Sequence, residues 1–235
     1  VDLESNVDLG WALFRPIGQL ISWMLTKMYA IIPNYGVVVI LFAFLIKLLL
    51  NPLTVKTFES TRKMQALAPE INKIKERYKN DPQKMSRAQM ELYKSSGANP
   101  MGGCLPMLIQ MPILVSVFSI FRSKIEFRGA PFFGWIDDLS VPDTLTELGG
   151  FPINILPVLM GSTMFIQQKM MAAPNADANQ KTMMYVMNAF FLFLFYSFPS
   201  GLNLYYFVFN LLSIIQQKYM IPNPVEAGSV VPLKK

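Results

Sequence analysis

The stretch "VVVILFAFLIKLLLNPLT", residues 37–54, constrains the fold more than any other part of the chain. It is apolar along nearly its whole length and does not alternate, which favours a membrane-crossing helix over a strand. Only helices and closed barrels satisfy their backbone hydrogen bonds inside a bilayer. Hydrophobic residues make up 52% of the chain and charged residues only 15%, and further apolar stretches follow. We therefore predict an all-α membrane protein.

The apolar stretches predict five transmembrane helices. The first core helix covers residues 35–54, and four more lie within residues 99–219, with an external loop at 122–150. We place these four at residues 100–121, 151–171, 182–198 and 202–219. Several of these spans are short, and short spans thin the membrane around them.

The two terminal segments are less apolar. Residues 1–34 form an N-terminal segment whose helical periodicity, from Leu13 to Met28, predicts an amphipathic helix lying in the membrane interface. Residues 220–235 contain prolines and are predicted to form a flexible tail.

Residues 55–98 differ from their surroundings because they are rich in Lys, Arg, Glu and Gln. Apolar residues recur at the three- and four-residue spacing of a coiled coil from Met64 to Tyr78. Asp81 and Pro82 then have the character of an N-cap and a first helical residue. We therefore predict a water-exposed helical hairpin of the coiled-coil type.

The charges predict an orientation. Residues 55–98 hold ten Lys and Arg against five acidic residues, whereas the loop at 122–150 holds five acidic and three basic residues. Basic loops stay on the cytosolic side of a membrane. The hairpin and the tail are therefore predicted to be cytosolic, and the N-terminus of this chain is predicted to lie outside. The net charge of +6 has the same explanation and does not indicate sequence-specific binding of nucleic acid.

The chain lacks residues that several classes of enzyme require. The chain has no histidine, and Cys104 is its one cysteine. This disfavours intramembrane hydrolysis by a histidine-assisted nucleophile and any histidine metal site. No phosphate-binding glycine loop is visible. We expect neither an enzyme nor a cofactor or metal.

Lys47 is the main candidate for a functional residue, because a charge at the bilayer centre costs about 2.5 to 3.5 kcal/mol. Its ammonium either snorkels to the headgroups or faces a polar, protein-lined groove. Polar residues on the other predicted spans are candidates for that lining, or they join helices by hydrogen bonds. These candidates are Gln110, Gln167, Gln168, Asn188 and Asn203.

Several motifs resemble the YidC/Oxa/Alb insertase family. They are "NPLT" at 51–54, "NPMGGCLPMLIQMPI" at 99–113, "APFFGWIDDLS" at 130–140, "ILPVLMGSTMFIQQKM" at 155–170 and "FPSGLNLYYFVFNLLSIIQQ" at 198–217. The resemblance implies five core helices around a hydrophilic groove with one positive residue, usually arginine, which here is Lys47. It also implies client contacts at Tyr205 and Tyr206, with Ala43 one turn before Lys47. Similar Gram-negative proteins carry a further span and a periplasmic domain upstream, which would suit a trimmed N-terminus here.

The resemblance implies a membrane protein insertase and chaperone of the bacterial cytoplasmic membrane, acting alone or with the Sec translocon. Its expected partners are nascent membrane proteins, the ribosome and membrane lipids. The rival hypothesis is a small-solute transporter or channel, which would need polar openings on both sides. A purely structural subunit would leave only snorkelling to account for Lys47.

Overall fold

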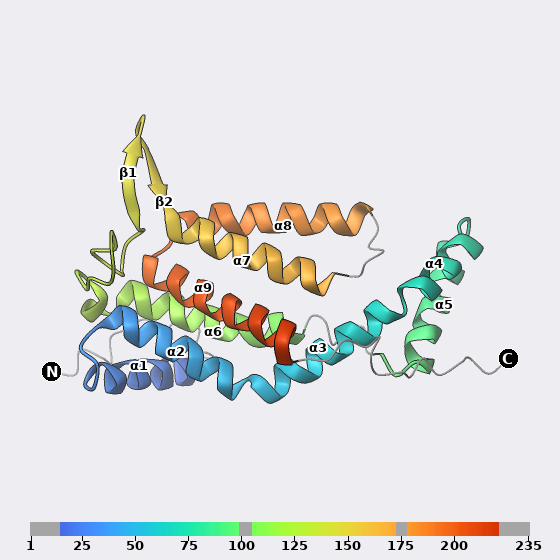
Figure 1. Cartoon of the computed structure of the whole chain (residues 1–235), viewed down its shortest axis with the longest axis horizontal. Coiled ribbons are helices and arrows are strands. Elements are labelled where there is room, and N and C mark those ends of the chain that lie inside the picture. The colour runs from blue at the N-terminus through green and yellow to red at the C-terminus, as the bar shows by residue number, and fades with distance from the viewer. Residues whose placement is uncertain (1–14, 99–104, 173–177, 221–235) are drawn as a thin grey trace.

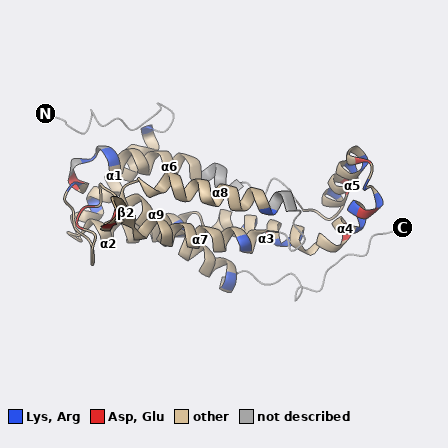
Figure 2. Cartoon of the chain, turned by 90° about the horizontal axis from the view of Figure 1, so that it is seen from above, with Lys and Arg blue, Asp and Glu red and all other residues tan. Residues whose placement is uncertain are grey.

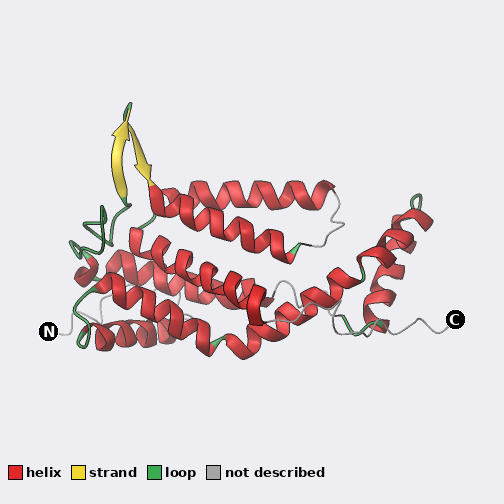
Figure 3. Cartoon of the chain, in the orientation of Figure 1, coloured by secondary structure: helices red, strands yellow, loops and turns green. Residues whose placement is uncertain are grey.

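The computed structural model describes residues 15–98, 105–172 and 178–220. Its helices run side by side in an elongated bundle (Figure 1; Figure 3). The elements of the bundle and its two ends are α1 (Arg15–Tyr29), α2 (Tyr35–Leu49), α3 (Asn51–Ala66), α4 (Ala68–Arg77), α5 (Pro82–Ser95), α6 (Leu105–Ser123), a short 3-10 helix (Ile125–Phe127), β1 (Thr144–Leu148), β2 (Phe151–Asn154), α7 (Ile155–Met171), α8 (Ala178–Tyr196), α9 (Ser200–Ile215) and a terminal π-helical turn (Gln216–Met220).

We call the end next to α4 and α5 the hairpin end, and the end formed by residues 124–154 the loop end. Charged residues gather at these two ends, and the middle of the bundle has few (Figure 2). The parts of the predicted elements that fall at 1–14, 99–104, 173–177 and 221–235, including most of the tail, lie outside the described residues.

The first predicted span, residues 35–54, is divided in the structure. α2 begins after Asn34, whose side chain accepts a hydrogen bond from Val37 N at 3.0 Å, and ends at Leu49. α3 continues at an angle of 65° to it. Pro52 explains the bend, because proline donates no backbone hydrogen bond and its ring clashes with the preceding turn.

Within the described residues, only α2 and α3 taken together meet the length and apolarity of a membrane span, and no helix does so alone. The five transmembrane helices therefore stay a prediction.

The coiled-coil prediction for Met64 to Tyr78 is wrong in one respect, because the helix breaks at Leu67. Pro69, in the first turn of α4, prevents a continuous helix. The turn that follows is as expected: Asp81 caps α5 by accepting from Lys84 N at 3.0 Å, and Pro82 is the first helical residue. This backbone hydrogen bond, together with one from the Lys84 side chain, lowers the pKa of Asp81. α4 and α5 pack against each other.

A β-hairpin corrects the all-α prediction. β1 and β2 pair antiparallel, so residues 151–154 are a strand and not the start of the third predicted span, which begins as α7 at Ile155. Gly149 and Gly150 form the turn with φ of 60° and 81°. Glycine adopts such positive φ values without steric cost, and this is the local reason for the hairpin.

α9 lies at the centre of the bundle and packs against α2, α6 and α7. Its residues Leu202 and Tyr205 are fully buried, together with Phe42 and Ala43 of α2. Gly201 is required at the start of α9, because a Cβ there would lie 2.3 Å from the Phe121 ring. Large apolar side chains remain exposed on the outer faces of the helices, Phe193 of α8 being 81% exposed.

Side chains at the loop end bind backbone groups. Asp143 is buried, and its Oδ2 accepts from Trp135 Nε1 at 3.1 Å, from Ile155 N at 3.0 Å and from Leu156 N at 2.7 Å. The last two are amide groups of the first turn of α7, which have no partner within the helix. Asp143 therefore fastens the loop to α7.

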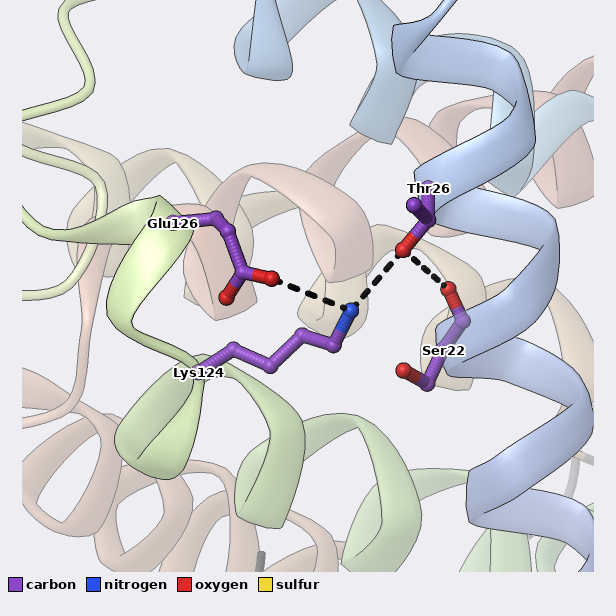
Figure 4. A network of polar contacts seen from close by, with 4 residues as sticks. All are labelled: Ser22, Thr26, Lys124 and Glu126. Atoms are coloured by element: carbon purple, nitrogen blue, oxygen red, sulfur yellow. Dashed lines mark hydrogen bonds and ion pairs between the residues drawn. The ribbon is translucent and has the colours of Figure 1, made fainter. Parts of the chain in front are cut away.

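The loop end is also joined to α1 by a polar network (Figure 4). Lys124 Nζ donates to Thr26 Oγ1 at 2.9 Å and lies 3.7 Å from Glu126 Oε1. The Thr26 hydroxyl in turn donates to Ser22 O at 3.0 Å. Lys124 is almost completely buried in this arrangement, so α1 is held against the end of α6.

Candidate functional site

Lys47 lies in the last turn of α2 and points into the bundle. Its side chain is 7% exposed, and Nζ donates to Ser213 Oγ of α9 at 2.7 Å. Ser213 Oγ donates to Phe209 O at 2.8 Å. Nζ also lies 5.1 Å from the ring centroid of Phe209 and 5.6 Å from that of Phe58. Since the ammonium turns toward α9 and α3, the structure favours an inward-facing charge over snorkelling.

Lys47 forms part of the wall of a recess, which has an empty volume of about 410 Å³ including space open to solvent. Helices α2, α3, α6, α7 and α9 all contribute to it. Its lining combines one cation, polar side chains and apolar walls: Lys47, Leu50, Leu53, Thr54, Thr57, Phe58, Gln110, Gln167, Phe209 and Ser213. We call this the Lys47 recess.

Two of the sequence candidates, Gln110 of α6 and Gln167 of α7, reach the Lys47 recess. Gln110 also lies beside the hydroxyls of Tyr205 and Tyr206. Gln110 Nε2 and both hydroxyls are buried and lack a hydrogen bond of good geometry. Buried polar groups are normally hydrogen-bonded, so this cluster behind the recess is poorly satisfied.

The expected client-contacting residues lie in the core of the bundle. Ala43 and Tyr205 are fully buried and Tyr206 is 8% exposed. The Tyr205 ring packs against Phe42 and Phe209. None of the three lines the Lys47 recess in this structure.

The other three polar candidates lie elsewhere. Asn188 Nδ2 donates to Gly161 O at 3.4 Å, joining α8 to α7. Asn203 Nδ2 donates to Phe195 O at 3.1 Å and to Phe198 O at 3.3 Å near the loop end. Gln168 does not line the recess, and its Oε1 is buried without a hydrogen bond. For Asn188 and Asn203 the structure fits the alternative role of joining helices.

Sequence reasoning missed the hydroxyl groups of the site, Ser213 on α9 and Thr54 and Thr57 on α3. A signal was present, because Thr54, Thr57 and Thr61 follow one another at spacings of three and four residues and so share one face of a helix. The sequence analysis divides this face, with Thr54 at the end of the first span and Thr57 and Thr61 in the cytosolic hairpin, and it does not predict the bend at Pro52 that turns the face toward α9.

Hydrogen bonds close the hairpin end of the bundle beyond the recess. Gln65 Nε2 of α3 donates to Met170 O at 3.0 Å and to Ala172 O at 2.9 Å, at the end of α7. Gln217 Nε2 donates to Met170 O at 3.3 Å, and Arg62 Nη2 donates to Gln217 O at 2.6 Å. We call these contacts the α3–α7 latch, since they hold α3 against α7 and the end of α9.

Comparison with known proteins gives a consistent result. The model of the family described as "60Kd inner membrane protein" matches residues 27–226. A protein of Haemophilus influenzae (strain KW20/Rd) named "Membrane protein insertase YidC" is 43% identical over 217 residues, which are 92% of this chain and 38% of that protein. A protein of Chlorobaculum tepidum with the same name is 44% identical over 229 residues, covering 93% and 38%.

Among solved structures, a crystal structure of an active YidC insertase with its first transmembrane domain resolved is similar to this chain with a TM-score of 0.64. The two sequences are 28% identical, and the match covers 88% of this chain and 46% of that one. The chain thus spans less than half the length of the relatives that it matches.

Proposed function

Since the chain belongs to the 60Kd inner membrane protein family, we propose that it acts as a membrane protein insertase and chaperone. The observation that carries the proposal is the Lys47 recess: a buried ammonium and several polar side chains sit among helices whose outer faces are apolar. A buried charge of this kind destabilises a membrane helix. The charge has a function if the site binds polar segments of other proteins.

The proposal includes the topology expected from the sequence. Five helices cross the membrane, and the basic α4–α5 hairpin is cytosolic. The sequence predicts α1 in the interface, but α1 runs along the bundle beside α2 and α6, so we place it next to the spans instead (Figure 1). The apolar outer faces of α7, α8 and α9 and the clustering of charges at the two ends support this arrangement (Figure 2). The Lys47 recess then opens in the cytosolic half of the membrane, and the loop end faces outward.

The recess acts by attracting acidic polar segments. A carboxylate about 4 Å from an ammonium gains about 4 kcal/mol at an effective dielectric constant of 20. This offsets the roughly 2.5 to 3.5 kcal/mol that an aspartate costs at the bilayer centre. The tail of a client therefore enters part of the membrane at little net cost. Its apolar segment moves into lipid, driven by about 25 cal/mol per Å² of buried apolar area, and no covalent step is needed.

The same proposal assigns the partners. Nascent membrane proteins are the clients, the basic hairpin faces the ribosome, and the Sec translocon joins for some clients. A small-solute channel is the weaker alternative, because polar side chains at the loop end, such as Asp143 and Asn203, bind backbone groups and do not face an opening.

The experiment is insertion of a single-span client into liposomes that contain the full chain, measured by protease protection of its acidic N-terminal tail. We expect Lys47→Met to slow translocation about tenfold, which corresponds to about 1.4 kcal/mol. Lys47→Arg should keep most of the activity because it keeps the charge. A second client with asparagines in place of the tail aspartates should be insensitive to either substitution. Equal rates for Lys47→Met and the unsubstituted chain with the acidic client would refute the proposal.

A further inference from the structure

The β1–β2 hairpin stands away from the bundle at the loop end. It projects across the helix axes and extends beyond α8 (Figure 1; Figure 3). The last cross-strand pair before the turn is Leu148 with Phe151, followed inward by Glu147 with Pro152. The turn consists of Gly149 and Gly150.

The base of this hairpin is firmly held. Thr144 Oγ1 donates to Asn154 Oδ1 at 2.8 Å, and Asn154 Nδ2 donates to Tyr196 O, the last residue of α8, at 2.8 Å. Tyr196 OH donates to Pro152 O at 2.5 Å and accepts from Asn154 N at 3.2 Å. With Asp143 bound to the first turn of α7, these contacts fix the direction in which the hairpin points.

The tip, in contrast, is apolar and exposed. Leu148 is 71% exposed and Phe151 is 74% exposed, and Leu145 is half exposed. Residues 144–154 contain no lysine or arginine and one acidic residue, Glu147. A two-stranded hairpin is at best marginally stable by itself in water. Here the contacts at the base hold the ribbon in place, and its tip presents a leucine and a phenylalanine that the rest of the described chain does not cover.

The exposed faces of α7 and α8 indicate which environment this is. They carry Val158, Phe190 and Phe193, which are 50%, 53% and 81% exposed. When these faces meet lipid, the helices stand across the bilayer, and a ribbon perpendicular to them at the loop end lies along the membrane surface. The exposed tip, which extends beyond α8, then lies above the lipid that surrounds α8 (Figure 1).

We propose that the β1–β2 hairpin binds the outer membrane surface and places Leu148 and Phe151 in the lipid interface. The occupant is lipid, not a second protein. Because the base is fixed to α7 and α8, this contact sets how deeply these two helices sit in the bilayer. The inference uses the proposed function only for the placement of the helices across a membrane and does not depend on client insertion.

The test is a depth measurement by spin labelling of the full chain, with Cys104→Ser, in liposomes. Labels at Leu148→Cys and Phe151→Cys are compared with a lipid-facing reference, Val158→Cys, and an aqueous reference, Asp137→Cys, which is exposed in the loop. Collision rates with oxygen, which is enriched in lipid, and with a water-soluble nickel chelate are measured. We expect both tip positions to give oxygen-to-nickel ratios at least threefold above that at Asp137.

A label is itself apolar, so the native tip needs its own measurement. A label at Glu147→Cys leaves Leu148 and Phe151 in place, and its ratio should fall to that of Asp137 when Leu148→Ser and Phe151→Ser are added. Tip labels that collide freely with nickel would overturn the proposal. Tip labels shielded from both reagents would also overturn it, since protein and not lipid would then cover the tip. Because no client is present, neither result bears on the insertase proposal.

Discussion

The loop end and the Lys47 recess differ in what their buried polar side chains bind. At the loop end, Asp143 Oδ2 accepts three hydrogen bonds, and Asn154 links the β-hairpin to α8. At the Lys47 recess, Lys47 has one hydroxyl partner, and Gln110 Nε2 has no hydrogen bond of good geometry. At the loop end these side chains bind backbone groups and complete the fold, although Asp143 Oδ1 and Asn203 Oδ1 have no hydrogen bond there. At the recess the polar side chains remain available for a client.

This difference predicts that similar substitutions in the two regions change the free energy of unfolding in opposite directions. Removing a polar group that serves the backbone leaves buried donors unpaired, which costs stability. Removing a buried charge that serves a client relieves a desolvation cost, so that stability is kept or gained while function is lost.

The largest expected effect on stability is that of Asp143→Ala. It leaves Trp135 Nε1 and the amides of Ile155 and Leu156 without their acceptor in a buried place. We expect a loss of about 3 kcal/mol in the free energy of unfolding. The measurement is unfolding of the purified chain in mixed micelles, followed by helical circular dichroism.

Asp143→Asn is the matched control, since it keeps a carbonyl oxygen of the same size as acceptor and should lose less than half as much. Equal losses for the two variants would show that charge, and not the capping of α7, is what Asp143 contributes.

Lys47→Met should act in the opposite direction. Methionine fills much of the same volume without a charge, and replacing buried ionic groups by apolar ones is often neutral or stabilising. We expect the free energy of unfolding to rise by about 1 kcal/mol, in the same micelle titration, although insertion falls. Lys47→Arg should show no rise. A destabilised Lys47→Met variant would mean that the ammonium holds α2 to α9 through Ser213 and is mainly structural.

The sequence predicts local interactions in these two regions well and long-range interactions poorly. Capping by Asp81 and the turn at Pro82 depend on neighbouring residues and were predicted correctly. The position of Lys47 in a long apolar run was also a local signal. Whether its ammonium snorkels or turns inward depends on Ser213, which lies 166 residues away, and no periodicity carries that information.

The errors have the same origin. The β-hairpin was missed because Phe151 was counted with the apolar run that follows it, although the Gly149–Gly150 turn pairs it with Leu148. Asn188 was grouped with the groove because a helical pattern shows that a residue is polar but not which neighbouring helix it faces.

The α3–α7 latch should give a smaller, local effect. Gln65→Ala removes two hydrogen bonds to the end of α7, worth about 1 kcal/mol in total because the carbonyls lie near the surface and regain water. We expect a broader distance distribution between spin labels at the exposed positions Lys63 and Lys169. Gln83→Ala, at an exposed position of α5, is the control and should leave the distribution unchanged. An unaltered distribution in Gln65→Ala would show that packing alone holds α3 in place.

The smallest effect is expected for Asn188→Leu, and it defines the boundary of the recess. The contact of Asn188 with Gly161 O is long, at 3.4 Å, and hydrogen bonds between membrane helices contribute about 0.6 kcal/mol on average. Unfolding should therefore change by no more than that amount, and insertion of the acidic client should not change. Gln110→Leu is the matched partner: it removes a similar amide from the wall of the Lys47 recess and should slow insertion several-fold at unchanged or increased stability. If the two variants slow insertion equally, the polar path extends to α8. Asn188 would then belong with Gln110 among the groups that receive a client, and not among those that complete the fold.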